Sequence, residues 1–457
     1  MLFLCLIVIC LYLNEFTLAF TPTNTVWGHS AVFADSRIYI TGGIIPKNLN
    51  FSGITFSKEF YYLDVEKPFG VGAGNKLPWV DLSFVSQILP EHTWSAFSNC
   101  GHDDSLILFP GEYRGLNVTD PKVYTYKLSS QQWNSFTPTN PPANYHSQSQ
   151  TVCDVRTGKM YRFGGIKPSP ATTNKYLDIL DTSTLVWKNG STVYAPEGRF
   201  DHTGTLLQNG IIVYIGGSSG FGEFVEMSEL LLYNTNNDTW TLMVRYIIFQ
   251  NTTGDLPTRR ACHSAVLTQD GRIIVYGGLT EDGGPAKDDL VILDTSQAVY
   301  TWSKANVSTN KPLPRYYHTA TLVGYYMIVI FGRNNEFLPP TTPNEVFILP
   351  NEVFILDTSD KSNYKWEKKT IKTRYVCTLS ADKLNLESRR VAFKNIFDNW
   401  KDRHMLLQIM KSSLEHTQPY QHQQQQQQQL KQLEDLIRIY KSKCIIKKYD
   451  TYGFEEF

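Results

Sequence analysis

Short runs of apolar residues recur between residues 26 and 366, and most of them end at glycine. The runs Ile38–Ile40 and Ile211–Ile215 are rich in β-branched and aromatic residues, a composition typical of β-strands. Because polar residues do not alternate with the apolar ones, we expect strands that are buried on both faces.

The runs belong to a unit that is repeated six times. Each unit begins with a histidine beside small or hydroxyl-bearing residues, continues through two apolar runs separated by glycine, and closes with a tryptophan. The histidines are His29, His92, His146, His202, His263 and His318. The glycines are Gly42, Gly43, Gly111, Gly164, Gly165, Gly216, Gly217, Gly277, Gly278 and Gly332. The tryptophans, at steps of 54, 54, 53, 62 and 64 residues, are Trp79, Trp133, Trp187, Trp240, Trp302 and Trp366. Such a period indicates a repeat architecture whose units bury one another.

Each unit has the pattern of a four-stranded antiparallel sheet. The glycines end the second strand, where the backbone needs a positive φ or a close approach, and the tryptophan packs from the outer strand. We therefore predict an all-β fold, a six-bladed β-propeller with blades at approximately 26–79, 90–133, 144–187, 199–240, 259–302 and 314–366. The ring is expected to close by packing between whole blades, or by a strand from Thr21–Val26 or Tyr375–Leu379 across the seam.

With its histidine, glycine pair and tryptophan, the unit resembles the Kelch repeat, over residues 26–366. The resemblance implies a Kelch-type propeller that acts as a binding or scaffold protein rather than as an enzyme, and that needs no cofactor. The segments YYLDVEKPF at Tyr61 and LPWVDLS at Leu77 are similar to secreted and cell-surface fungal Kelch proteins described as galactose-oxidase-like.

The loops that follow the glycine pairs vary in length and leave the sheets at the same edge, so they share one face of the predicted disc. Function usually lies on such loops. We expect a protein or glycan ligand there, with Phe221, Glu223 and Phe224 of a glycine-rich tip as candidate contacts.

A secreted copper oxidase resembling galactose oxidase is an alternative. Tyr317 with His318, and Tyr145 with His146, are similar to the tyrosine–histidine ligand pair of that family. The copper site of that family also uses a tyrosine linked to a cysteine, and a histidine from a later β-domain. No residues that could take these two roles can be identified in this sequence. The repeated histidines are better explained as repeat residues that bond to neighbouring backbone, and no phosphate-binding or GxSxG motif is present.

Residues 1–19 have the pattern of a signal peptide, with an apolar run from Leu2 to Leu13 and small residues before the cleavage point after Ala19. The usual positive charge before the run is missing, and a core strand or an uncleaved anchor is the alternative. No other apolar stretch is long enough for a transmembrane helix. Six glycosylation sequons agree with a secreted or cell-surface glycoprotein: Asn50, Asn117, Asn189, Asn237, Asn251 and Asn306.

The five cysteines beyond the signal are Cys100, Cys153, Cys262, Cys377 and Cys444. Their odd number and wide spacing match neither a disulfide framework nor a zinc motif. Cys100 and Cys153 hold similar places in adjacent units, so one bridge is an alternative. We expect two free, buried thiols.

The formal net charge of the chain is zero, which provides no electrostatic footprint for nucleic acid. Residues 20–366 carry a net charge of −5, whereas the tail 367–457 carries +6. The tail holds a glutamine run, 423–429, between two stretches of helical spacing. We expect a partly disordered appendage. The alternative is self-association through a short coiled coil, as in an intracellular Kelch scaffold that oligomerises through its tail.

Two segments interrupt the repeat. PNEVFIL occurs twice in succession, at 343–349 and 350–356, and the second copy is the one that fits the blade. VRYIIFQ at 244–250 stands where the other units have a short polar link. Either segment is a sequence-level insertion or an exposed contact patch.

Overall fold

The computed structural model describes residues 20–22, 26–46, 53–66, 68–72, 76–100, 104–109, 111–113, 122–142, 146–168, 171–243, 252–307, 311–333 and 352–367. Within these ranges the chain forms strands and turns and contains no helix. No helix in the described part of the chain is long and apolar enough to cross a membrane.

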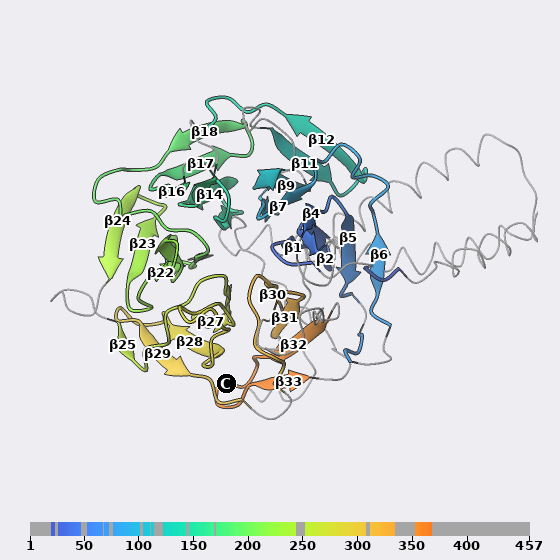
Figure 1. Ribbon diagram of the computed structural model, residues 1–457. Helices are drawn as coiled ribbons and strands as arrows, with labels where there is room; N and C mark the ends of the chain where they lie inside the picture. Colours follow the sequence, from blue (N-terminus) through green and yellow to red (C-terminus); the bar gives the residue numbers. More distant parts are fainter. Residues whose placement is uncertain are drawn as a thin grey trace, which may run out of the picture. The chain divides into compact units, whose positions relative to one another are not determined.

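Six antiparallel sheets stand around a common axis, in chain order (Figure 1). From the axis outward, the first is β1 (Ser30–Ala34), β2 (Arg37–Thr41), β5 (Phe60–Asp64) and β6 (Trp79–Asp81). The second is β8 (Ala96–Ser98), β9 (Ser105–Phe109), β11 (Val123–Lys127) and β12 (Gln132–Phe136). The third is β13 (Thr151–Asp154), β14 (Lys159–Phe163), β17 (Leu177–Asp181) and β18 (Val186–Asn189). The fourth is β19 (Thr203–Leu206), β20 (Ile211–Ile215), β23 (Leu230–Asn234) and β24 (Thr239–Met243). The fifth is β26 (Ser264–Leu267), β27 (Arg272–Tyr276), β28 (Leu290–Asp294) and β29 (Thr301–Lys304), and the short β25 (Thr253–Gly254) pairs in parallel with β29. The sixth is β30 (Thr319–Val323), β31 (Tyr326–Ile330), β32 (Val353–Asp357) and β33 (Lys365–Glu367). The predicted six-bladed propeller is confirmed.

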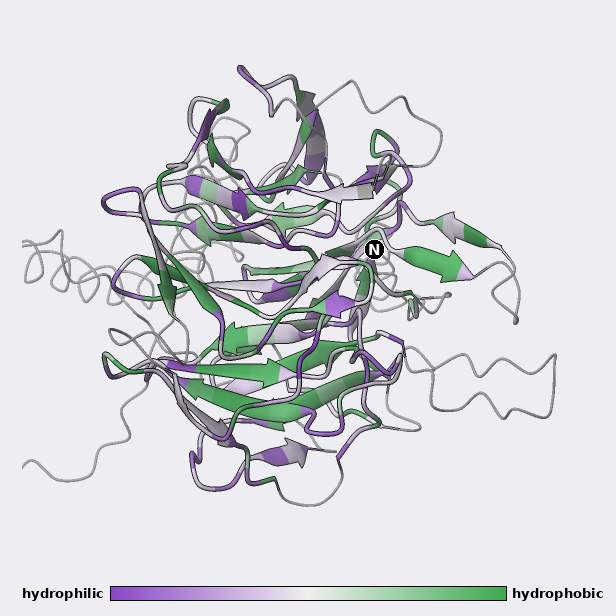
Figure 2. Cartoon of the chain, turned by 60° about the vertical axis from the view of Figure 1, so that its left-hand side comes forward, coloured by the Kyte–Doolittle hydropathy of each residue, from purple (hydrophilic) through white to green (hydrophobic). Residues whose placement is uncertain are grey.

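The second strand of each blade is the most deeply buried, as its unbroken apolar run predicts. In β20, Val213 and Ile215 have no exposed surface and pack against Ile273 and Val275 of the next blade. Figure 2 shows the hydrophobic colour concentrated along such strands and the hydrophilic colour on turns. Burial on both faces is favourable only when a neighbouring blade covers each face, so the blades depend on one another for their cores.

The six tryptophans lie in the outer strands, and each is at most 6% exposed. The glycine pairs end the second strands with positive φ, for example 71° at Gly42 and 108° at Gly43. Gly111 has no positive φ, but a Cβ there would collide with the backbone of Trp94. The two reasons expected for glycine, conformation and close approach, both occur.

Blades one and six meet as complete four-stranded sheets. Ile38, Ile40 and Trp79 of blade one form one apolar cluster with Ile328 and Ile355 of blade six. Among the described residues, each strand of these two sheets comes from its own repeat. Among the described residues, packing between whole blades joins the two ends of the ring. Residues 23–25 of the segment Thr21–Val26, and the segment Tyr375–Leu379, lie outside the described residues.

Cys100 and Cys153 form a disulfide, so the expectation of two free thiols is wrong. Cys100 follows the inner strand of blade two and Cys153 lies in the inner strand of blade three, and their Cα atoms are 5.4 Å apart. That separation falls within the usual range for a bridge. Cysteine spacing along the chain could not reveal it because neighbouring inner strands converge only in the closed ring.

Residues 353–356 of the second PNEVFIL copy lie in β32 of blade six, as predicted. The first copy, VRYIIFQ, residues 1–19 and the tail from residue 368 lie outside the described residues, as do Tyr145, Asn50, Asn117 and Asn251.

Candidate functional site

Each inner strand is preceded by a residue with positive φ, between 48° and 63°, and these six residues surround the axis. We call them the axial ring: Gly28, Trp94, Gln148, Asp201, Cys262 and Tyr317. Five of them are not glycine, so their backbone conformation is unfavourable and must be stabilised by the surrounding structure.

Backbone hydrogen bonds join neighbouring ring residues at five of the six junctions between blades. The N–H of Asp201 donates to the Gln148 carbonyl at 2.9 Å, that of Cys262 to Asp201 at 2.9 Å, and that of Tyr317 to Cys262 at 3.0 Å. Across the seam the Gly28 N–H donates to Tyr317 at 3.1 Å, and the Trp94 N–H donates to Gly28 at 2.8 Å. These bonds hold the unusual φ values in place.

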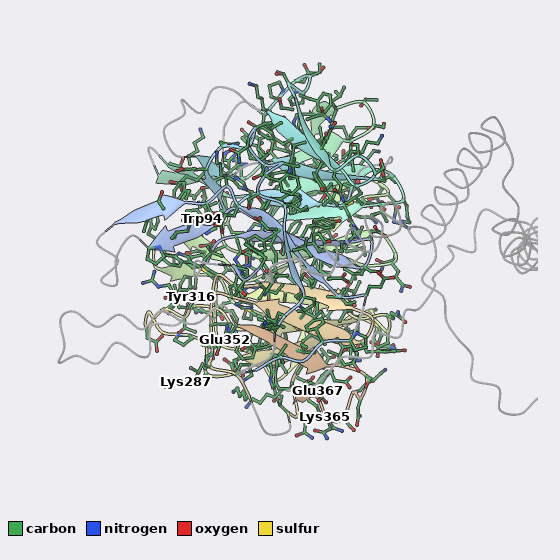
Figure 3. The ribbon with its side chains drawn as sticks, turned by 90° about the vertical axis from the view of Figure 1, so that its right-hand side faces the viewer. Trp94, Lys287, Tyr316, Glu352, Lys365 and Glu367 are labelled. Carbon is green, nitrogen blue, oxygen red and sulfur yellow. A yellow bond between two sulfur atoms is a disulfide. The ribbon has the colours of Figure 1, made fainter. Side chains whose placement is uncertain are left out.

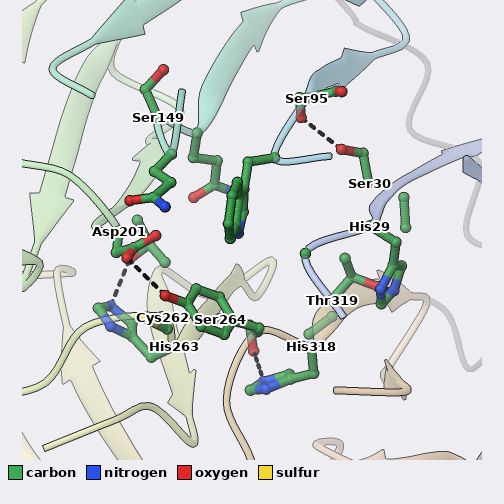
Figure 4. A pocket seen from close by; sticks show the side chains of 18 of the residues that line it. His29, Ser30, Ser95, Ser149, Asp201, Cys262, His263, Ser264, His318 and Thr319 are labelled. Atoms are coloured by element: carbon green, nitrogen blue, oxygen red, sulfur yellow. Dashed lines mark hydrogen bonds between the residues drawn. The ribbon is translucent and has the colours of Figure 1, made fainter. Parts of the chain in front are cut away.

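A cavity of about 200 Å³ lies on the axis, lined by the ring residues and by the residues that follow each of them (Figure 4). Serine, threonine and glutamine supply much of the lining, and Ala31, Ala265 and Ala320 line it from the inner strands. Asp201 is the only acidic residue among the lining residues, and none of them is lysine or arginine. We call this cavity the axial channel.

Asp201 lies between two neutral groups of the ring. The Tyr317 hydroxyl donates to its carboxylate at 3.3 Å, and the Cys262 thiol is also a hydrogen-bond partner. Burial raises the pKa of Asp201 to about 7, and burial also raises the pKa of Cys262 and of Tyr317. Asp201 therefore titrates near neutral pH, whereas the thiol and the phenol stay protonated.

Four of the repeated histidines, His29, His202, His263 and His318, directly follow a ring residue, and all but His202 bond to a hydroxyl group of the preceding blade. The Nε2 atoms lie 2.9 Å from Thr319 Oγ1 for His29, 3.0 Å from Thr203 Oγ1 for His263, and 2.8 Å from Ser264 Oγ for His318. Burial lowers the pKa of His29, His202 and His263 to about 3, so these rings are neutral. His29, His263 and His318 therefore have a side-chain partner. His92 Nδ1, by contrast, lies 2.8 Å from the Pro90 carbonyl oxygen, the kind of backbone partner that the sequence predicted.

His92 and His146 do not belong to that set, contrary to the sequence alignment of the units. They lie two residues before their ring residues, Trp94 and Gln148, and serine follows the ring residue in both blades. In blades four to six that earlier position holds Arg199, Arg260 and Arg315, whose Nη1 atoms donate to backbone carbonyls of their own blades at 3.3, 3.1 and 2.9 Å. A histidine next to serine or threonine therefore does not mark the same structural position in every blade. Equivalent positions are identified by the residue with positive φ.

The copper candidates do not come together as a ligand pair. The Tyr317 hydroxyl faces Asp201, and His318 Nε2 faces Ser264, while His146 is buried and does not line the axial channel. Among the described residues, no three or more His, Cys, Asp or Glu side chains are grouped as metal ligands.

The connections between second and third strands all leave one face of the disc. Their first residues form β-bridges to the residues before the axial ring, as in Trp27 with Ile44 and Phe200 with Ser218. Three of them are hairpins, β3–β4 (Ile44–Pro46, Ile54–Phe56), β15–β16 (Ile166–Pro168, Ala171–Thr173) and β21–β22 (Ser218–Gly220, Glu223–Phe224). Seen from the edge, Trp94, Tyr316 and Lys287 lie toward the same side (Figure 3). We call this side the hairpin face.

The candidate binding residues lie on the hairpin face. Phe221 is 76% exposed and its ring centroid is 5.8 Å from that of Phe200, and Glu223 is also exposed. Phe224 is half-buried and packs against a cluster that includes Cys262 and Tyr316. The hairpin tip therefore touches the residues that form the axial ring.

The three sequons within the described residues are exposed. Asn189 ends β18, and Asn237 lies in the turn between β23 and β24, where the Thr239 hydroxyl donates to its side-chain oxygen at 2.7 Å. Asn306 donates from its side chain to the Ser362 carbonyl at 2.8 Å.

Sequence reasoning found Tyr317 but missed Trp94, Gln148, Asp201 and Cys262. These residues share no chemical type, so a search for a repeated motif passes over them. Their signal is positional, because each ring residue stands 15 to 17 residues before the last glycine of its second strand.

Six four-stranded antiparallel blades around an axial channel define a β-propeller. The model of the KLHDC2/KLHL20/DRC7 Kelch-repeats domain matches residues 28–248 and 245–381, and the chain belongs to this Kelch-repeat family.

Several known proteins are similar to the chain. Putative adagio-like protein 2 of Oryza sativa subsp. japonica is 25% identical over 349 residues, which is 74% of this chain and 51% of that protein. Adagio protein 3 of Arabidopsis thaliana is 22% identical over 315 residues, 65% of this chain and 49% of that protein, so the chain spans about half of each. Kelch domain-containing protein 3 of Rattus norvegicus is 26% identical over 297 residues, covering 62% of this chain and 70% of that protein.

A solved structure described as the structure of YjhT superposes with a TM-score of 0.51 at 14% identity, over 76% of this chain and 98% of that one. At this identity the likeness supports the fold alone.

Proposed function

We propose that this protein is a binding scaffold that acts outside the cell or on its surface, and that a partner protein docks on the hairpin face. Kelch propellers generally bind proteins, and this common use of the family supports the proposal. Phe221, Glu223 and Phe224 are the contact residues that we propose.

The observation that carries this proposal is the exposure of large apolar side chains in the connections of the hairpin face. They occur in the links between second and third strands and in the links that lead into inner strands. Their exposed fractions are 41% for Ile54, 68% for Phe84, 46% for Ile88, 44% for Tyr176, 76% for Phe221 and 43% for Leu313. The turns at the opposite ends of the strands hold fewer such side chains, Val155, Val299 and Tyr325. A surface with more exposed apolar groups is the better candidate for a contact surface.

Phe221 is the best single anchor on this face. Its ring already rests against Phe200, so little conformational freedom remains to be lost when a partner binds. Exposed aromatic anchors of this kind often dominate the binding energy of an interface.

Site-specific photocrosslinking tests the face. A photoreactive phenylalanine at position 221 of the full chain is expected to give a defined adduct with a partner protein. The matched control places the same group at Tyr325, which is 42% exposed in the turn between β30 and β31, at the opposite ends of the strands. Equal adducts at both positions, or adducts at 325 alone, would contradict docking on the hairpin face.

The extracellular location has its own support and its own test. A disulfide between inner strands persists in oxidising compartments, and Asn237 has the exposure and local hydrogen bond of an accessible acceptor. Protein purified from its native source is expected to carry a glycan at Asn237 or Asn189 and an oxidised Cys100–Cys153 pair. Unmodified asparagines together with reduced cysteines would favour the intracellular scaffold that oligomerises through its tail.

A further inference from the structure

We propose that the axial channel is a binding site for an organic ammonium group, with Asp201 as its counter-ion. This inference concerns the channel alone and does not depend on the partner of the hairpin face. The channel can accept an amine whether or not a protein docks outside it.

The charge of the channel selects a cation. Asp201 is the only side chain among the lining residues that becomes charged between pH 7 and pH 8, because no lysine, arginine or glutamate lines the channel. The four histidines of the lining, His29, His202, His263 and His318, are held neutral by burial. An anion would find no opposite charge there, whereas a cation finds one carboxylate.

Asp201 has no cationic partner among its hydrogen-bond partners, which distinguishes it from the buried carboxylate of Asp178 in β17. Its hydrogen-bond partners are the neutral Tyr317 hydroxyl and the neutral Cys262 thiol. Asp178, by contrast, is paired with the guanidinium of Arg162 at 2.8 Å. A carboxylate that is withdrawn from water and paired only with neutral donors gains the most from an incoming positive charge.

Two aromatic side chains of the channel lining add a second attraction for a cation. Trp94 and Tyr317 belong to the axial ring, their ring centroids are 6.0 Å apart, and both side chains are half-buried. An ammonium group near an aromatic face is stabilised by the ring quadrupole, and more strongly where water is scarce.

The size and lining of the channel favour a slim amine over a metal ion. About 200 Å³ accommodates several waters or one short alkyl chain. A metal ion prefers several charged or strongly donating ligands, and the described part of the chain brings no three His, Cys, Asp or Glu side chains together. One carboxylate among hydroxyl and amide oxygens matches the single charge and the three donors of a primary ammonium.

Calorimetric titration of the full-length protein tests the site. The probe is n-butylammonium chloride, and the matched controls are neutral 1-butanol and sodium butyrate, which have the same chain length. At pH 8 we expect saturable binding of the amine and at least tenfold weaker binding of both controls. Absence of amine binding, or equal binding of 1-butanol, would overturn the proposal.

The pH dependence tests the role of Asp201 without any mutation. The titratable groups that face its carboxyl are Cys262 and Tyr317, which stay protonated, and the neighbouring His202 and His263 stay neutral. Since the pKa of Asp201 is about 7 and only the ionised form attracts a cation, affinity at pH 6 should be about tenfold lower than at pH 8. An affinity that does not change over this range contradicts the assignment.

Asp201→Asn keeps the shape of the side chain and removes its charge, so amine binding should fall at least tenfold and lose its pH dependence. The control is Asp289→Asn, which removes another buried carboxyl with a raised pKa, paired with Lys311 and absent from the channel lining. Binding by Asp201→Asn at wild-type strength would refute the proposal. A peptide with one internal lysine separates the two sources of the ammonium: if it binds as the probe does, the source is a protein side chain, and if only butylammonium binds, it is a free amine.

Discussion

The backbone N–H of Gly28 donates a hydrogen bond of 3.1 Å to the carbonyl oxygen of Tyr317, and this bond joins the first blade to the last. The same Gly28 accepts a hydrogen bond from the N–H of Trp94, so one residue links three blades. Gly28 has φ of +63°, and a Cβ there would lie 2.8 Å from the indole Nε1 of Trp94. The largest side chain of the axial ring thus lies beside its only glycine.

Gly28→Ala is expected to destabilise the fold by about 1–3 kcal/mol, because it adds a collision with Trp94 to an unfavourable φ. Chemical denaturation measures the change. The control is Gly222→Ala, which has φ of +80° and no atom within 4 Å of its Cβ, so it carries the backbone cost alone. Equal losses for the two variants would mean that the contact with Trp94 contributes nothing.

Trp302→Ala should lower the free energy of unfolding by about 3–5 kcal/mol, the usual range for emptying a core site of this size. Trp302 is 1% exposed, and its indole N–H donates to the Met227 carbonyl at 3.1 Å. Phe84→Ala, at a side chain that is 68% exposed, is the control and should change stability by less than about 0.5 kcal/mol. Similar losses in urea titrations would argue against the outer-strand tryptophans as core residues.

Reduction of the Cys100–Cys153 bridge should lower stability by about 2–4 kcal/mol, because the bridge closes a loop with a sequence separation of 53 residues. Thermal unfolding with and without dithiothreitol measures the effect. The double variant Cys100→Ser/Cys153→Ser should match the reduced protein and no longer respond to reductant. A wild-type protein that is indifferent to dithiothreitol speaks against the bridge.

Asp178→Asn should cost about 3–5 kcal/mol, because it leaves the guanidinium of Arg162 buried without its counter-charge. Both side chains of this pair are at most 4% exposed, and Arg162 lies over the ring of Phe109. The exposed pair Arg259 and Glu281, with side chains 45% and 49% exposed, is the comparison, and Glu281→Gln should cost less than about 1 kcal/mol. If denaturant titrations gave similar losses of stability for Asp178→Asn and Glu281→Gln, the conclusion that burial makes the Arg162–Asp178 pair more important would be contradicted.

Stability should fall as the pH drops below about 6.5, because histidines that are neutral in the fold become charged only in the unfolded chain. The pKa values of His29, His202 and His263 in the folded protein are lowered to about 3. Between pH 6.5 and pH 3, each of these histidines therefore lowers the free energy of unfolding by up to about 1.4 kcal/mol for every pH unit that the pH falls. Asp201 opposes this trend because its pKa is raised in the folded protein. The stability that its protonated carboxyl contributes is fully present below about pH 4 and is lost as the pH rises to about 7. Urea midpoints at pH 7.5, 6.5 and 5.5 measure the balance, and a midpoint unchanged at 5.5 would be inconsistent with neutral buried histidines.

Much of the architecture could be read along the chain. The apolar runs predict the second strands, the spacing of the tryptophans predicts the outer strands, and Gly43 or Gly217 marks where a strand must turn. The hairpin face also follows from strand order, because loops after second strands leave every blade at the same edge. The contact residues on that face remain a prediction.

The histidine register and the state of two cysteines show where sequence reasoning failed. His92 resembles His29 in its neighbours, yet it lies two residues before its ring residue, in the position of Arg260, whereas His29 directly follows its ring residue. Nothing in the local sequence of Cys100 distinguishes a thiol from a half-cystine.

The amino-acid sequence alone determined the number of blades and the order of their strands, because each repeat carries the same local pattern of apolar runs, glycine and tryptophan. Only the tertiary structure decided what meets at the axis. The axial ring draws one residue from each of six distant segments, and these residues are as different as glycine, tryptophan and aspartate. Their proximity, like the disulfide and the isolated carboxylate of Asp201, exists because six blades close into a circle, and closure leaves no pattern of residue type along the chain.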